Sequence, residues 1–146
     1  GERLTLVLSG AATGFYLPEE DVFWPNYFVS LETYCDSIRK LSSIDAERAA
    51  LCHNTVVEAE FDQYLKDALA ATEAYHNELL TRLANGEDFA AIAREKGDWV
   101  VSLTDIQTPE VIHSLSRTLI KRSQAEANKP NLFVPAQIEY TIHRKR

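Results

Sequence analysis

The longest regular pattern in the sequence is a run of apolar residues at helical spacing between Phe61 and Leu83. The run covers about six turns on one face. Its members are Phe61, Tyr64, Leu65, Ala68, Leu69, Thr72, His76, Leu79, Leu80 and Leu83. Asn85-Gly86 follows, and glycine accepts the left-handed conformation that ends a helix. The pattern predicts a long helix over 59–84, with His76 on its core-facing side.

Two further helices are predicted after it. Phe89, Ile92 and Ala93 indicate a short helix that ends at Gly97. Thr108-Pro109-Glu110 combines a capping hydroxyl with a proline at the first helical position, which predicts a helix over 109–125. Residues 58–128 are therefore expected to form a helical extension.

The first part of the chain has a different pattern. The short apolar runs Leu4–Leu8 and Ala49–Cys52 are typical of buried strands, and Ser30 is a good N-cap for a helix between them. The apolar stripe of that helix is Leu31, Tyr34, Cys35, Ile38 and Leu41. Strand, helix and strand form a βαβ-like unit, so we expect an α/β fold with helices on a face of a sheet.

Residues 9–29 show no period and contain two glycines and two prolines, which predicts a long loop. Its aromatic residues are Phe15, Tyr16, Phe23, Trp24, Tyr27 and Phe28. Solvated linkers are poor in aromatic residues, so this loop should be packed down. It lines a substrate entrance or an oligomer contact, or it simply packs over the sheet.

Charge and cysteine content narrow the class of protein. The formal net charge is −7, which disfavours generic nucleic-acid binding. No apolar run approaches the roughly 20 residues that cross a bilayer, so no membrane span is expected. Cys35 and Cys52 are the two cysteines, too few for a disulfide framework, and we expect reduced thiols in a cytoplasmic protein.

The start of the chain is unusual. The sequence contains no methionine and opens with Gly1-Glu2-Arg3 directly before an apolar run. This beginning suggests that the chain is the back part, or fragment, of a larger polypeptide. The alternative is removal of an initiator methionine before a small residue.

His53 is the leading candidate for chemistry, because it follows a predicted strand at the end where α/β folds place ligands. It is either a metal ligand or a structural histidine. His113 and His143 are expected to be surface or half-buried residues. Glu19-Glu20-Asp21 is interpreted as a solvated acidic loop and not as a metal cluster, and Gly10–Gly14 lacks the lysine of a phosphate-binding loop.

Three segments resemble the carboxyl-terminal half of a metallo-β-lactamase-fold hydrolase. Leu4–Leu8 with Ser9-Gly10-Ala11-Ala12-Thr13-Gly14-Phe15 resembles the strand and loop that normally carry a metal-bridging aspartate. Phe23-Trp24-Pro25-Asn26-Tyr27-Phe28 and Ser30-Leu31 resemble a loop and helix start of one branch of that superfamily. Leu51-Cys52-His53-Asn54 resembles the strand end that carries the last metal-binding histidine.

The resemblance implies part of an αββα sandwich, with a dinuclear metal centre that activates a bridging hydroxide. Zinc is the expected metal, with manganese or iron as alternatives, and esters, lactones or thioesters are the implied substrates. His53 would bind the second metal. The expected aspartate falls at Gly10 or Ala11, and the family's histidine-x-histidine-x-aspartate-histidine run is absent. The chain is therefore expected to need its missing amino-terminal half to complete the site.

A second interpretation is a degenerate, non-catalytic domain that acts through oligomerisation or partner binding. Both interpretations predict that the chain associates, either with the missing half or with a copy of itself. The expected organisation is a metallo-β-lactamase-like half-domain over 1–57, the helical extension over 58–128, and a tail over 129–146 with a possible short strand at Ile138, Tyr140 and Ile142.

Overall fold

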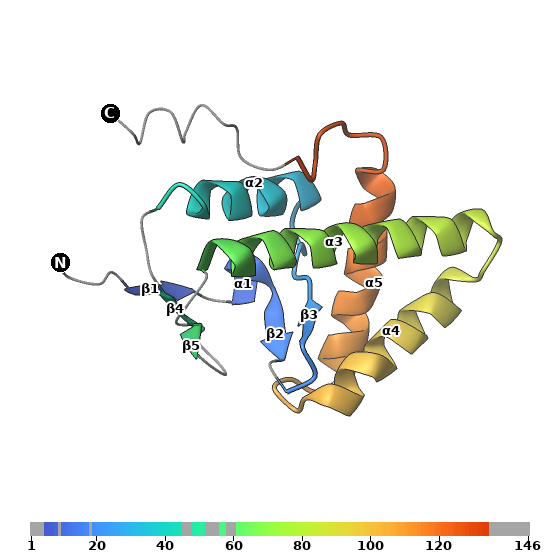
Figure 1. The fold of residues 1–146 in the computed structure, drawn as a ribbon. Helices are drawn as coiled ribbons and strands as arrows, with labels where there is room; N and C mark the ends of the chain where they lie inside the picture. Colours follow the sequence, from blue (N-terminus) through green and yellow to red (C-terminus); the bar gives the residue numbers. More distant parts are fainter. Residues whose placement is uncertain are drawn as a thin grey trace.

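The fold is described from a computed structural model (Figure 1). It describes the backbone of residues 5–8, 10–17, 19–44, 48–51, 56–57 and 61–134, and within these the side chains of 12–17, 19–44 and 61–134. The strand predicted around Ile138, Tyr140 and Ile142 lies outside these residues, as does His143.

Helices dominate the described chain. They are α1 (Gly10–Thr13), α2 (Leu31–Leu41), α3 (Phe61–Ala84), α4 (Phe89–Leu103) and α5 (Pro109–Ala125). The strands are β1 (Thr5–Leu8), β2 (Phe15–Leu17), β3 (Val22–Trp24), β4 (Arg48–Leu51) and β5 (Val56–Val57). They form a sheet of order β1-β4-β5 and a separate β2-β3 hairpin.

The predicted αββα sandwich is wrong, because the described fold is mostly helical. A sandwich needs two broad sheets that bury their inner faces against each other. Here the strands are short, and the described apolar side chains are buried mainly between helices. Figure 1 shows β1, β4 and β5 beyond the amino-terminal end of α3, while α3 crosses α5 at the centre of the molecule.

The smaller prediction within this region is confirmed. β1 and β4 pair in parallel, with Leu8 opposite Leu51, and α2 connects them through the chain. Because parallel strands need a crossover connection, the strand–helix–strand pattern in the sequence was informative. Helix α2 begins as expected, since the Ser30 side chain accepts a hydrogen bond from the Thr33 backbone N–H.

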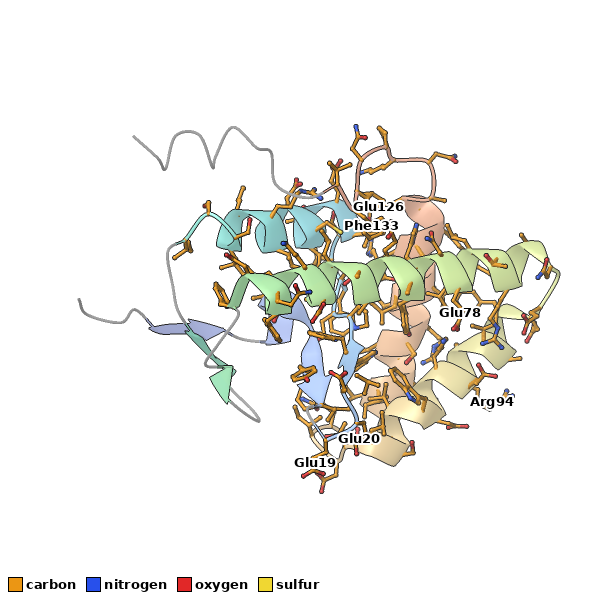
Figure 2. All side chains as sticks on the ribbon, in the orientation of Figure 1. Glu19, Glu20, Glu78, Arg94, Glu126 and Phe133 are labelled. Atoms are coloured by element: carbon orange, nitrogen blue, oxygen red, sulfur yellow. The ribbon has the colours of Figure 1, made fainter. Side chains whose placement is uncertain are left out.

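The long loop expected over residues 9–29 is instead partly regular. It contains α1 and the β2–β3 hairpin, in which Phe15 pairs with Trp24. Elements of three or four residues are too short to reveal a period, which explains the error. Glu19 and Glu20 lie exposed at the tip of the hairpin (Figure 2), and Asp21 turns the chain with a φ of 52°.

The ends of the later helices follow the predictions at two points and depart from them at one. Helix α3 ends at Ala84, just before Gly86 with a φ of 85°, and α5 begins at Pro109 with Thr108 as its cap. Helix α4, however, continues through Gly97 to Leu103. At Gly97 a Cβ atom would lie 2.4 Å from Cδ2 of His113, so this glycine permits close packing of α4 on α5.

One cluster of buried residues joins both sides of the predicted boundary at residue 57. Leu31 and Ile38 of α2 belong to it together with Leu79 of α3, Ile92 of α4 and Leu119 of α5. The described part of the chain contains no helix that is long and apolar enough to cross a membrane.

Candidate functional site

The strands β1 and β4, on which the resemblance partly rests, end at Leu8 and Leu51. These residues are paired in the parallel register of β1 and β4, so the two strands finish at the same edge. His53 follows two positions later in the sequence and lies outside the described residues, as does Cys52. Gly10, one of the two positions where the resemblance expects an aspartate, begins α1.

The described residues do not fit the implied metal centre. Among residues 5–44, 48–51, 56–57 and 61–134, less the gaps at 9 and 18, no group of three His, Cys, Asp or Glu side chains is placed to hold an ion. A catalytic zinc needs about three protein ligands, and a lone histidine does not supply them.

The six aromatic residues of the predicted interface loop divide into two groups. Phe15, Trp24 and Tyr27 are buried in the core. Tyr16, Phe23 and Phe28 are partly buried and pack against it. The Tyr16 and Phe23 rings lie 4.7 Å apart by their centroids, and both contact the Tyr64 ring of α3. Packing over α3 therefore accounts for part of this cluster.

Tyr27, Ser123 and His76 form a buried chain of hydrogen bonds that joins the segment before α2 to α5 and α3. The Tyr27 hydroxyl lies 2.6 Å from Oγ of Ser123, which lies 2.9 Å from Nδ1 of His76. Burial lowers the pKa of His76, although the nearby Glu126 carboxylate opposes the shift. The expectation that His76 is a core residue is confirmed, because it is only 3% exposed.

This Ser–His pair does not make a hydrolytic nucleophile. Ser123 is completely buried, and its hydroxyl already contacts both Tyr27 and His76. A nucleophile has to reach the substrate with its attacking oxygen. The geometry instead suits a network that fixes three segments relative to one another.

Glu126 caps α2 from the other end of the described chain. Its carboxylate accepts hydrogen bonds from the backbone N–H of Leu31 at 2.6 Å, from that of Glu32 at 2.9 Å and from the Ser30 hydroxyl at 3.2 Å. Burial raises the pKa of this carboxyl, but the hydrogen bonds from Glu32, Leu31 and Ser30 and the Lys129 charge outweigh burial and lower it. A negative charge is favoured here because it lies at a helix amino terminus.

Two cavities open at the surface of the described helices. The first, of about 520 Å³, lies beside His76. It is lined by Glu73, His76, Asn77, Leu80, Ala127, Lys129, Asn131, Leu132, Phe133 and Val134. The second, of about 560 Å³, lies between β3, α3 and α4, where Phe23, Tyr75 and Trp99 contribute aromatic walls and Asp21, Glu78, Glu95 and Lys96 contribute charges.

Sequence reasoning missed Ser123 and Glu126 as partners in these networks. Ser123 sits on α5 without any local signal, and a glutamate at a helix end is indistinguishable from an ordinary surface charge. Their partners lie more than 90 residues away at Tyr27 and Leu31. For His76, the position on the apolar stripe was a usable signal of burial.

Comparison of the chain with protein-family models and with curated proteins gives no match.

Proposed function

We propose that the chain contributes His53 to a metal-dependent hydrolase related to the metallo-β-lactamase superfamily, and that the remaining metal ligands come from a further segment or chain. The parallel pairing of β1 and β4 is the observation that supports this proposal. It brings Leu8 and Leu51 to one edge of the sheet. Ligands of α/β folds bind beyond the carboxyl ends of such strands, which is where His53 would follow.

The proposed substrates are esters, lactones or thioesters, and zinc is the proposed metal, with manganese or iron as alternatives. The proposal also includes a cytoplasmic location. The free thiol of Cys35 supports it, because cysteines stay reduced in that compartment.

The test is the metal content of the polypeptide translated from the complete reading frame that contains this chain. Elemental analysis of the unmodified protein is compared with His53→Ala and with the control His143→Ala. The proposal expects His53→Ala to lose bound metal and ester, lactone and thioester hydrolysis, and His143→Ala to retain both. Equal metal content in the His53 variant and the unmodified protein would overturn it.

A second candidate function is a non-catalytic partner-binding module. The aromatic groove between β3, α3 and α4 favours it, because Tyr75, Trp99 and Phe23 offer apolar walls. Three carboxylates line the groove with the ammonium of Lys96, which pairs with Glu78 and lies 5.0 Å from the Tyr75 ring centroid. Arg82, outside the lining, pairs with Glu78 and Glu95. The aromatic faces with carboxylates beside them suit a partner segment that carries lysine or arginine.

Titration with an arginine-rich peptide, followed by tryptophan fluorescence, tests this second function. Saturable binding that Glu78→Gln weakens and Asp62→Gln leaves unchanged would support it, since Asp62 lies on the same helix and does not line the groove. Sedimentation over a range of concentrations tests the copy of the chain as a partner. A monomer that does not bind the peptide would exclude this function.

A further inference from the structure

We propose that the aromatic groove between β3, α3 and α4 binds its partner segment through arginine and discriminates against lysine, because Lys96 of the chain itself occupies the ammonium position of the groove. This inference rests on the second function proposed above and names the residue that the partner has to supply. The groove has a volume of about 560 Å³ and is lined in part by the small residues Ala71 and Ala74, so it has room for a long side chain.

The contacts of Lys96 show how the groove holds a cation. Its ammonium lies 5.0 Å from the centroid of the Tyr75 ring and pairs with the Glu78 carboxylate. An ammonium over an aromatic face is attracted to the ring, and the attraction is stronger where water is partly excluded. The Lys96 side chain is only 13% exposed, whereas that of Glu78 is 48% exposed and accessible from solution. A position for a positive charge is therefore formed, and it is filled from within the chain.

The three carboxylates that line the groove all have partners in the described structure. Both oxygens of Glu95 accept hydrogen bonds from Arg82, and Asp21 accepts one from a tyrosine hydroxyl 2.9 Å away. Glu78 pairs with Lys96 and lies 3.6 Å from Nη1 of Arg82. A partner cation therefore has to replace a contact that already exists, and it binds only if it gains more than it displaces.

A partner lysine gains little from such a replacement. Its ammonium would take over the contacts that Lys96 already makes with Tyr75 and Glu78, which exchanges one ammonium for another. Lys96 is attached to the chain and competes at a high effective concentration, whereas a free segment loses translational and rotational freedom when it binds. The balance of these effects disfavours lysine.

A partner arginine gains more than it displaces. The guanidinium group is planar, donates to both oxygens of one carboxylate and stacks on aromatic faces, and it is less strongly hydrated than an ammonium group. Glu78 offers a half-exposed carboxylate for the paired hydrogen bonds. Phe23, Tyr75 and Trp99 supply the aromatic walls on which the guanidinium stacks. We expect arginine to displace Lys96 from Glu78, so that the Lys96 ammonium moves into solvent.

The experiment compares two peptides of equal length and charge that contain no tryptophan, one with arginine and one with lysine at every basic position. Each is titrated into the full chain while tryptophan fluorescence is followed. The arginine peptide is expected to bind about tenfold more tightly, equivalent to ~1.4 kcal/mol. Lys96→Met removes the internal ammonium and keeps an apolar stem. In this variant the lysine peptide should bind, and the preference for arginine should decrease severalfold.

Arg94→Met is the matched control, because it removes one positive charge from the same helix at a residue that does not line the groove. Figure 2 shows Arg94 on the side of α4 that faces away from α3. Its preference for arginine should equal that of the unmodified protein. A second measurement follows the displaced residue. Acetylation of Lys96, quantified by mass spectrometry, should increase when the arginine peptide saturates the protein, whereas acetylation of Lys121 on α5 should not change.

The outcomes separate this inference from the second function. Equal binding of the two peptides to the unmodified protein, or an unchanged preference in Lys96→Met, would overturn the inference and leave the second function in place. Peptide binding to Lys96→Met alone, or lower acetylation of Lys96 in the saturated complex, would show that arginine does not displace Lys96 and would also overturn it. Absence of binding of either peptide to both proteins would exclude the second function, and the inference with it.

Discussion

At the residue scale, Gly14 and Gly86 have nearly the same backbone conformation but different surroundings. Their φ angles are 87° and 85°. A Cβ at Gly14 would lie 2.8 Å from both the Trp24 carbonyl oxygen and the Tyr34 hydroxyl, whereas a Cβ at Gly86 would meet nothing within 4 Å. The comparison separates backbone strain from crowding.

Gly14→Ala is expected to reduce the free energy of unfolding by about 3 kcal/mol, because it combines left-handed strain with a backbone clash. Gly86→Ala should lose only about 1 kcal/mol, since strain alone applies. Urea denaturation of both variants measures the difference. Equal losses would show that the hairpin relaxes around the added methyl group.

The contacts of His113 predict how its contribution to stability depends on pH. Its Nδ1 lies 2.7 Å from the Pro109 carbonyl oxygen and its Nε2 lies 2.8 Å from Oδ1 of Asp98, so only the doubly protonated ring donates to both. The hydrogen bond to Pro109, followed by that to Asp98, raises the pKa of His113.

Because folding raises the pKa of His113, this stabilisation is fully present below the pKa of the unfolded chain, about 6.5. It is lost as the pH rises through the pKa of the folded protein. The contribution should be below about 1 kcal/mol, because the pair is partly exposed. His113→Gln should remove this loss from the profile of unfolding free energy above about pH 6.5. A profile identical to that of the unmodified protein would contradict the assignment.

At the scale of elements, Glu126 links the end of α5 to the start of α2. Glu126→Gln should reduce the free energy of unfolding by about 1–3 kcal/mol, because a charged acceptor of buried N–H groups is lost. Glu20→Gln is the control, since Glu20 is exposed at the hairpin tip. Thermal denaturation measures both.

The pH dependence of the same carboxylate has the opposite sign to that of His113. Folding lowers the pKa of Glu126, so its contribution to stability is present above the pKa of the unfolded chain, about 4.5. That contribution is lost as the pH falls through the pKa of the folded protein. Glu126→Gln should flatten the acid limb of the stability profile. An unchanged acid limb would show that the capping bonds do not hold in solution.

The packing of α4 on α5 depends on the contact between Gly97 and His113, and this gives a second prediction at the scale of elements. Gly97→Ala should lower stability by about 1–3 kcal/mol, because the new methyl group overlaps the imidazole ring. In the His113→Ala background the methyl group has room, and the same change should have a much smaller cost. A double-mutant cycle measures this coupling, and additive effects would contradict the contact.

At the scale of the whole molecule, the shared core predicts one cooperative unfolding transition. Leu31 of α2 and Leu119 of α5 are both completely buried in the same cluster. Leu31→Ala and Leu119→Ala should each cost about 2–5 kcal/mol and shift the whole transition, followed by circular dichroism in the far and near ultraviolet. Val29→Ala is the control, because Val29 is 84% exposed. Separate transitions would divide the molecule near residue 57.

The candidate sites differ in how far the sequence anticipated them. His53 came from its position after a short apolar run, and it stays a prediction because it lies outside the described residues. The cavity beside His76 was not anticipated, because α3 and residues 127–134 build it together. The αββα sandwich failed for a related reason: short apolar runs identify strands but do not say how many strands gather into one sheet.

What the sequence determined by itself is local. Ser30, Thr108 and Gly86 set helix ends through bonds and backbone angles within a few residues, and the apolar stripe of α3 followed from a period of 3.6. Only the tertiary structure decided that α4 continues past Gly97 and that Glu126 caps α2. Those outcomes depend on packing between residues far apart in the chain, and such partners leave no mark in the sequence near either one.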